Sequence, residues 1–199
     1  MISRRASKRR LLSIGIFGGT FNPVHKGHLL LAEGALKRLR LDRLIWVPAR
    51  IPPHKRLERG ASTMDRYRMV KLATRGNRAF HVSRLEIDRP GPSYSIDTVK
   101  QLQRIYRKEA IWYLLVGADS AAALSRWRQI DRLKKLVRFA AVPRPGSGRR
   151  AAGWVKQLPV RTRDISASDI RRRLREGRTI RSLVPESVRA YILRKGLYR

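Results

Sequence analysis

The segment GGTFNPVHKGH, residues 18–28, joins an apolar run at residues 11–17 to a helical pattern that begins at His28. A strand, a glycine-rich turn and a helix start in this order bring free backbone N–H groups and the positive end of a helix dipole to one point. His25 and His28 add two side chains that can donate hydrogen bonds to phosphate oxygens. The segment therefore predicts an anion-binding site between the first strand and the first helix.

Short apolar runs and helical patterns alternate along the rest of the chain. Strands are expected at residues 11–17, 44–48, 80–87, 111–116 and 138–142. Helices are expected at residues 28–40, 64–75, 96–107 and 121–136. After a breaker-rich loop at residues 143–153, an extended piece is expected at 158–161 and closing helices at 168–176 and 185–195. This order predicts an α/β fold, a single Rossmann-like parallel sheet with helices on both faces and a short helical C-terminal extension.

The composition fits one domain. Of 199 residues, 42% are hydrophobic, and residues 11–199 are expected to form the domain behind a disordered basic tail at residues 1–10. No small-residue cleavage site follows the apolar run, so we expect no secretory signal. Cysteine is absent, and no apolar run reaches the roughly 20 residues of a membrane span. We therefore expect a cytoplasmic protein with no membrane partner, and the sequence permits a homo-oligomer.

The net charge of +33, from 47 lysines and arginines against 14 acidic residues, predicts attraction to polyanions. A nucleic-acid-binding protein is therefore one interpretation. The basic runs contain few aromatic residues, however, and the chain has no zinc-finger or RRM signature. We expect no specific nucleic acid partner and attribute the charge to an arginine-rich composition.

Three familiar kinds of site are not supported. The chain has neither a GxxxxGK[ST] phosphate loop nor a GxGxxG dinucleotide fingerprint after its first strand. His25 and His28 have the spacing of two metal ligands on one helical face, but they have no cysteine partners. Gly27 between them favours close approach of the backbone rather than a rigid ligand platform. We expect no protein-bound metal.

With its flanks, GGTFNPVHKGH resembles the (T/H)xGH signature of the nucleotidyltransferases, in particular bacterial nicotinate-nucleotide adenylyltransferases. The resemblance implies adenylyl transfer from ATP to nicotinate mononucleotide, giving deamido-NAD and pyrophosphate, with Mg²⁺ on the ATP phosphates. It implies catalysis by His25, His28 and Arg171, and ATP contacts from Gly18, Gly19, Thr20, Phe21, Lys26 and Gly27. Asn22, expected to bind the acceptor substrate, replaces the aspartate of many relatives. Because a phosphate monoester is largely anionic near neutral pH, such a site needs alignment and positive donors rather than a base.

A second motif, ISASDIR at residues 165–171, resembles the family's ISxTxIR element. On its own it fits an ordinary helix capped by a hydroxyl. The resemblance implies that Ser166, Ser168 and Arg171 hold the β- and γ-phosphates of ATP, where an arginine fork suits the leaving group.

Further motifs resemble the family's elements for the acceptor. Gly117-Ala118-Asp119 with Trp127 implies that Asp119 contacts ribose and Trp127 stacks on the pyridine ring. The GPSY segment at residues 91–94 implies a carboxylate site, with Tyr94, Ser95 and Thr98 among its residues, and Lys55 is expected to reach a phosphate. Without the resemblance, these residues fit a helix cap, core packing and surface turns. Arg128 stands where relatives often carry an aromatic residue, and its cation would suit a carboxylated ring.

Three alternatives remain open at this stage. The acceptor could be the amide form of the mononucleotide or phosphopantetheine, with the same chemistry. The chain could also be a nucleic-acid-binding protein on the same fold. The GPSY segment and Trp127 favour a pyridine nucleotide, and the intact His25, His28, Ser168 and Arg171 favour an active enzyme.

Overall fold

A computed structural model describes residues 10–53, 60–106, 109–142, 152–160 and 164–199. Its core is a six-stranded, entirely parallel sheet in the order β3-β2-β1-β4-β5-β6. The strands are β1 (Leu12–Gly19), β2 (Arg43–Pro48), β3 (Phe80–Val82), β4 (Ala110–Gly117), β5 (Arg138–Val142) and β6 (Lys156–Gln157). This is the strand order of a doubly wound Rossmann sheet, so the predicted fold class is confirmed.

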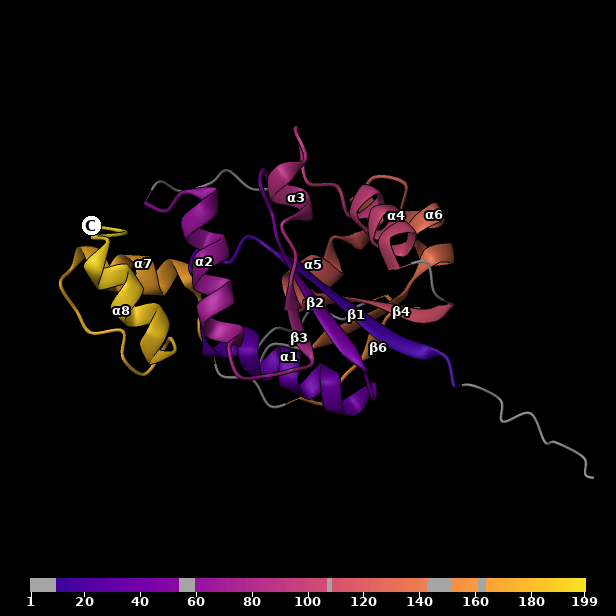
Figure 1. Cartoon of the computed structure of the whole chain (residues 1–199), viewed down its shortest axis with the longest axis horizontal. Helices are drawn as coiled ribbons and strands as arrows, with labels where there is room; N and C mark the ends of the chain where they lie inside the picture. Colours follow the sequence, from indigo (N-terminus) through magenta and orange to yellow (C-terminus); the bar gives the residue numbers. More distant parts are fainter. Residues whose placement is uncertain (1–9, 54–59, 107–108, 143–151, 161–163) are drawn as a thin grey trace, which may run out of the picture.

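Helices flank the sheet on both faces (Figure 1). Eight α-helices and one 3₁₀ helix, η1, occur in the described residues: α1 (Lys26–Arg38), α2 (Thr63–Thr74), α3 (Leu85–Asp88), α4 (Ser95–Tyr106), α5 (Ala118–Ala122), η1 (Leu124–Arg126), α6 (Ile130–Leu136), α7 (Ala167–Arg175) and α8 (Glu186–Arg194). Because strand side chains alternate between the two faces, Phe17 packs in the core that includes α1, α2, α7 and α8. Its neighbour Ile16 packs in the other core, with α4, α5 and α6.

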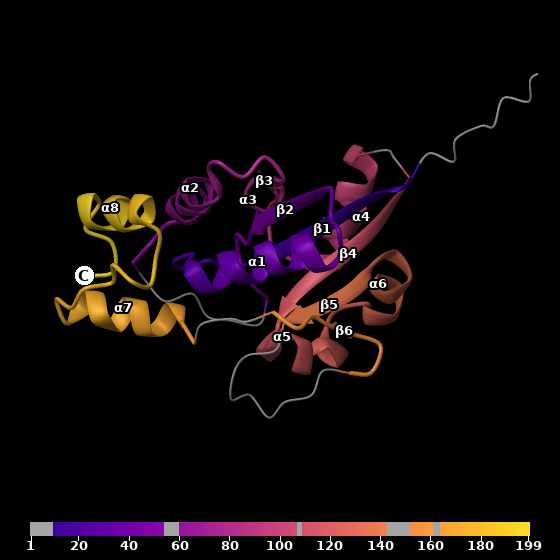
Figure 2. The ribbon, with the colours of Figure 1, turned by 90° about the horizontal axis from the view of Figure 1, so that it is seen from below.

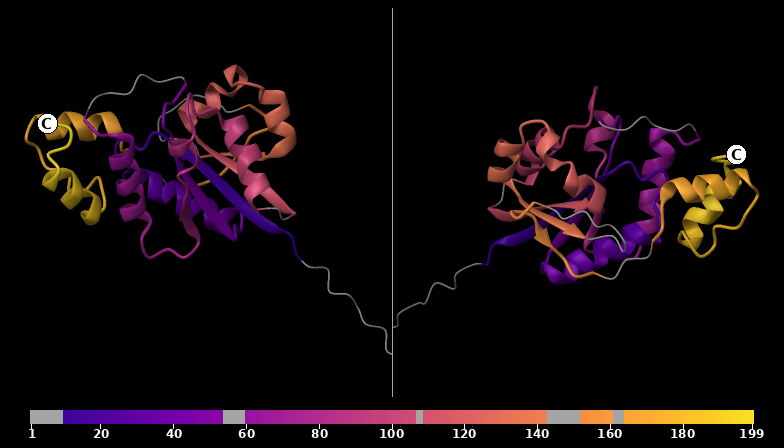
Figure 3. Two further views of the ribbon diagram at one scale, coloured as in Figure 1. Left: turned by 45° about the horizontal axis from the view of Figure 1, so that its top comes forward. Right: turned by 180° about the vertical axis from the view of Figure 1, so that it is seen from behind.

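The closing helices form the predicted C-terminal extension. Helices α7 and α8 lie together at one end of the molecule, beside α2, and α1 lies across the sheet (Figures 2 and 3). Ile170 on α7 and Val188 and Ile192 on α8 are fully buried in the same core as the sheet. The extension is therefore part of the domain. Residues 1–9 of the basic tail and most of the breaker-rich loop lie outside the described residues, whereas Arg10, the last residue of the tail, forms an ion pair with Asp42.

Two predicted elements are wrong. The strand expected at residues 80–87 ends at Val82, because the Ser83 hydroxyl accepts a hydrogen bond from the Leu85 N–H and helix α3 begins there. The single helix expected at 121–136 is divided into α5, η1 and α6. Gln129 adopts a left-handed conformation with φ of 54°, which a continuous α-helix does not allow.

The last strand is also displaced from its prediction. The extended piece expected at 158–161 pairs with the sheet earlier, at Lys156–Gln157, and Leu158 continues it with one N–H bond to the carbonyl of Ala141. Within the described residues, no helix combines the length and apolar character required to cross a bilayer.

The topology determines where a ligand can bind. Strand β1 pairs with β2 on one side and β4 on the other, so the strand order reverses at β1. In doubly wound sheets the ligand crevice opens at the carboxyl ends of the strands at this reversal. The Gly18–Gly19 end of β1 and the Gly117 end of β4 both lie there.

Candidate active site

His25 is the N-cap of α1, so both histidines of the motif lie at the start of that helix. The backbone N–H of His25 donates a hydrogen bond to Nδ1 of His28 at 3.2 Å, and the imidazole centroids are 3.7 Å apart. Because Nδ1 of His28 accepts this bond, its neutral ring carries the proton on Nε2. The Phe21 ring meets the His28 ring edge-on at 5.1 Å. The structure thus fixes the His28 ring and makes Nε2 its donor atom.

The glycines expected in a turn, Gly18 and Gly19, are the last two residues of β1, and they line the crevice with Thr20, which follows them. A Cβ on Gly19 would lie 2.9 Å from the Phe21 ring. Phe21 has a φ of 48° and its side chain is only 2% exposed, packed against Phe17. Phe21 is also not among the described residues that line the crevice, so its contacts here support the loop and its predicted contact with ATP stays a prediction.

Arg171 joins the two phosphate motifs. It is 6% exposed, and its guanidinium donates to the carbonyl oxygen of Asn22 at 2.7 Å and to the Ser168 hydroxyl at 3.0 Å. Ser166 caps α7 by accepting the Asp169 N–H. Segments 149 residues apart in sequence are thus brought together.

Two residues of the first motif, Asn22 and Lys26, form side-chain hydrogen bonds with residues near the C-terminus. The Asn22 side chain, expected to bind the acceptor, is 5% exposed and accepts a hydrogen bond from the Tyr198 hydroxyl at 2.7 Å. Lys26 directs its ammonium group to the carbonyl oxygen of Arg181 at 3.4 Å, and Gly27 follows it in the first turn of α1. The Asn22 side chain therefore belongs to the framework that holds the loop.

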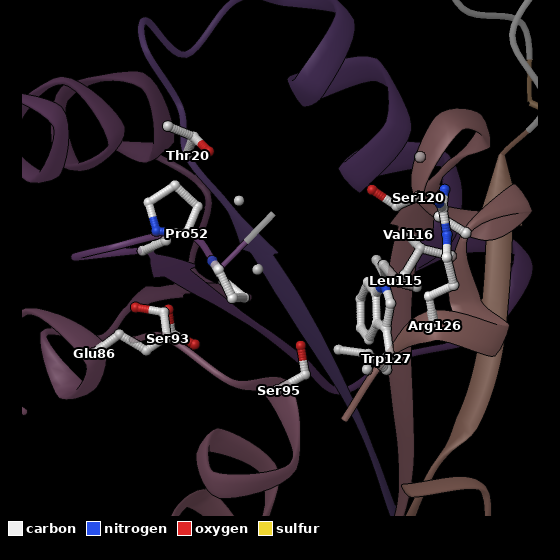
Figure 4. Close-up of a pocket in the computed structure, with 17 residues that line it drawn as sticks. Thr20, Pro52, Glu86, Ser93, Ser95, Leu115, Val116, Ser120, Arg126 and Trp127 are labelled. Atoms are coloured by element: carbon white, nitrogen blue, oxygen red, sulfur yellow. The ribbon is translucent and has the colours of Figure 1, made fainter. Parts of the chain in front are cut away.

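A cavity of about 500 Å³ opens at the carboxyl ends of β1 and β4, and we refer to it as the crevice. Figure 4 shows Pro52, Glu86 and Ser93 on one side of it and Ser120, Arg126 and Trp127 on the other. This volume is typical of small-molecule sites. His25, His28 and Arg171 are not among the described residues that line it. They belong instead to the motifs adjoining the Gly18–Gly19 end of β1.

A smaller cavity of about 90 Å³ adjoins the crevice where α4 begins, and we refer to it as the α4 cavity. Tyr94, Ser95, Trp127 and Arg128 line it, which brings the two predicted acceptor motifs together. The guanidinium of Arg128 lies over the Tyr94 ring. Thr98 is 2% exposed and donates its hydroxyl to Glu86 at 2.6 Å, so this hydroxyl is engaged within the protein.

Glu86 is a crevice residue that the sequence analysis did not identify. It is 6% exposed, lines the crevice and accepts the Thr98 hydroxyl. Burial raises the pKa of its carboxyl, and hydrogen bonds from Thr98 and Ser93 offset only part of this effect. The sequence does not predict Glu86 at the site, because the apolar pattern predicts one continuous strand over residues 80–87.

Arg66 was missed as well. It is 1% exposed, and its guanidinium donates to the carbonyl oxygens of Thr20 at 2.8 Å and Ala49 at 2.6 Å. Desolvation lowers the pKa of this buried group. Because Thr20 and Ala49 both line the crevice, Arg66 holds two of its loops at a fixed separation.

Lys55 lies outside the described residues, and so does the side chain of Asp119, although its backbone begins α5 directly after β4. No group of three or more His, Cys, Asp or Glu side chains suited to a metal occurs in the part of the chain that the structure describes.

Comparison with known proteins supports the same interpretation. The model of the cytidylyltransferase-like family matches residues 16–173. A probable nicotinate-nucleotide adenylyltransferase of Geobacillus thermodenitrificans is 45% identical over 185 residues, covering 93% of this chain and 85% of the relative. The chain belongs to the nicotinate-nucleotide adenylyltransferase family. It is accordingly a nucleotidyltransferase.

Other members of the nicotinate-nucleotide adenylyltransferase family cover the chain equally well. A probable member from Thermus thermophilus is 43% identical, covering 94% of this chain and all of the relative. A crystal structure from Vibrio parahaemolyticus, described as a putative member, has a TM-score of 0.69 at 20% identity and covers 95% of this chain and 96% of that chain. The Plasmodium falciparum nicotinic acid mononucleotide adenylyltransferase complexed with NaAD has a TM-score of 0.76 at 18% identity, covering 94% and 97%. At such identities the two structures establish a shared fold.

Proposed function

We propose that this protein transfers the adenylyl group of ATP to nicotinate mononucleotide, giving deamido-NAD and pyrophosphate in NAD biosynthesis. The observation that carries the proposal is the bond from Arg171 to the Asn22 carbonyl. This bond joins the ISASDIR segment to the loop after β1, and the crevice that this loop borders is also lined by Trp127. The arrangement supports the roles that we propose for these two segments in holding the phosphates of ATP. The names of the close relatives support the same substrates.

The reaction is an in-line displacement at the α-phosphorus. A phosphate oxygen of the mononucleotide forms the new P–O bond, the bond from the α-phosphorus to the bridging oxygen breaks, and pyrophosphate leaves with the electron pair. Because the attacking phosphate is already anionic, no protein base is required. The protein contributes alignment and hydrogen-bond donors where negative charge grows.

Two groups of donors serve this step. Nε2 of His28, with the backbone N–H groups of Gly18, Gly19 and Thr20, stabilises charge on the α-phosphate. Ser166, Ser168 and Arg171, at the start of α7 beside the loop after β1, receive the departing pyrophosphate. His25 positions His28 through its backbone N–H and provides a second imidazole beside it.

The acceptor occupies the other half of the crevice. Trp127 stacks on the pyridine ring, and Ser95 at the start of α4 approaches the ring carboxylate. Tyr94 and Thr98 shape this end, Thr98 through its bond to Glu86. Asp119 and Lys55 keep their assignments from the sequence, a ribose contact and a phosphate contact.

Mg²⁺ fits as a companion of ATP rather than as a resident of the protein. The described residues offer no carboxylate cluster for it, and Mg²⁺ in nucleotide sites is held largely by phosphate oxygens and water. When bound, it would neutralise charge on the leaving pyrophosphate. We propose a cytoplasmic location because the proposed donor, ATP, is produced and used inside the cell.

The test is to incubate the purified protein with ATP and, in parallel, nicotinate mononucleotide, nicotinamide mononucleotide or phosphopantetheine. Chromatography and mass spectrometry should identify deamido-NAD as the most rapidly formed product, with one pyrophosphate for each molecule. Faster turnover of either other acceptor would contradict the substrate assignment.

A further inference from the structure

A second cavity, of about 670 Å³, lies between α2, β3 and α8. We call it the basic groove and define it by Arg68, Lys71, Arg75, Phe80, His81, Tyr191 and Arg194. The described residues that line it share no member with the lining of the crevice. Its volume falls in the range of about 300–1,000 Å³ found for small-molecule sites.

The groove concentrates positive charge. Arg68, Lys71 and Arg75 follow the i, i+3, i+7 spacing of one helical face on α2, and Arg194 approaches from α8. No acidic side chain is among the described lining residues, and within the described chain Lys71, Arg75 and Arg194 form no ion pair with a carboxylate. Like charges held together repel each other, and a bound anion would offset that cost.

Two aromatic residues, Phe80 and Tyr191, line the groove. The half-buried Phe80 ring is fixed by an edge-to-face contact with Trp46 at 5.6 Å. Tyr191 is only 5% exposed; its hydroxyl donates to Asp65 at 2.7 Å, and the Arg194 guanidinium lies 5.7 Å from the centre of its ring. An aromatic ring at Phe80 beside clustered cations suits a ligand that combines a planar ring with a phosphate.

We propose that the basic groove is a second ligand site, which binds a nucleoside phosphate. Lys71, Arg75 and Arg194 hold the phosphate, and Phe80 contacts the base. This site is separate from the proposed active site and does not depend on the proposed reaction.

His81 provides a local readout because it lines the groove. Partial burial and the positive charge of Arg43 lower the pKa of its imidazole. A phosphate bound in the groove would add negative charge near this imidazole, oppose that effect and raise the pKa of His81.

The experiment is an NMR pH titration of the histidine ring signals of the full chain, with and without AMP at matched ionic strength. Matching is necessary because salt alone screens Arg43. The His81 signal is assigned from its loss in His81→Gln. We expect AMP to raise the His81 pKa, and inorganic phosphate at the same concentration to raise it less.

The double variant Lys71→Ala/Arg75→Ala should lose the His81 response to AMP. The double variant Lys37→Ala/Arg38→Ala, which removes two exposed cations from the last turn of α1, should keep it. An unchanged His81 pKa in the wild type, or the same shift in the Lys71→Ala/Arg75→Ala protein, would overturn the site. An equal shift with inorganic phosphate would overturn the role of the base.

Discussion

The guanidinium carbon of Arg128 lies 4.7 Å from the centroid of the Tyr94 ring. This contact connects two walls of the α4 cavity, since Tyr94 precedes α4 and Arg128 follows Trp127. Within the described residues Arg128 has no ion pair with a carboxylate. Its charge can therefore contribute to the recognition of an acidic ring substituent.

We expect the enzyme to prefer the acid mononucleotide to the amide, and Arg128→Gln to reduce this preference. Hydrogen bonds to charged groups contribute about 1.5–3 kcal/mol, and solvent screening at this exposed side chain lowers that value, so kcat/KM for the acid should fall about tenfold. The value for the amide should change little. The measurement is kcat/KM for both substrates. Arg132→Gln is the charge-matched control, because Arg132 lines neither the crevice nor the α4 cavity. An equal loss for acid and amide would show that Arg128 has only a structural role.

The buried carboxyl of Glu86 should make stability depend on pH. Because burial raises its pKa in the folded protein above the usual value of 4.5, the folded state holds this proton more tightly than the unfolded chain. Its contribution to stability is therefore complete below about pH 4.5 and is lost as pH rises through the folded-state pKa. Glu86→Gln should remove this loss. Urea unfolding over a pH series measures the effect, and parallel profiles for the two proteins would contradict it.

Tyr198→Phe should destabilise the fold, with little change in the ratio of kcat/KM for the acid and amide mononucleotides. The hydroxyl of this buried tyrosine donates to Asn22 at 2.7 Å, and losing a buried hydrogen bond costs about 1–3 kcal/mol. Chemical denaturation of Tyr198→Phe and of Tyr67→Phe, which changes a half-buried tyrosine on α2, measures the difference. Equal stabilities of the two variants would show that the Tyr198 hydroxyl does not stabilise the loop.

The local parts of this site were predictable from sequence, and the long-range parts were not. The strand, turn and helix around residues 18–28 are encoded by neighbouring residues, and their prediction is confirmed. Arg66 and Glu86 are buried charged residues whose partners, Thr20, Ala49 and Thr98, lie 46, 17 and 12 residues away. No periodic pattern signals such pairs. The predicted helix is interrupted before α6 because one residue, Gln129, is left-handed, and the spacing of apolar residues does not predict this conformation.

The large positive charge should produce only weak, sequence-independent binding to DNA. Attraction of this kind depends on counterion release, so the affinity should fall steeply as the salt concentration rises. Fluorescence anisotropy with several unrelated duplexes at a series of salt concentrations measures it. Tight binding of one sequence at physiological salt would contradict this prediction.

The central claim is that His28 donates a hydrogen bond to the α-phosphate as charge grows there, and steady-state kinetics of His28→Ala test it most directly. Removing one such donor typically costs about 10²–10³ in kcat, whereas ground-state binding changes less. We therefore predict a fall in kcat of about 100-fold or more with a much smaller change in the KM for ATP, and a similar kcat loss for His25→Ala. Circular dichroism should show that both variants fold. A folded His28→Ala protein with near-normal kcat would contradict the mechanism.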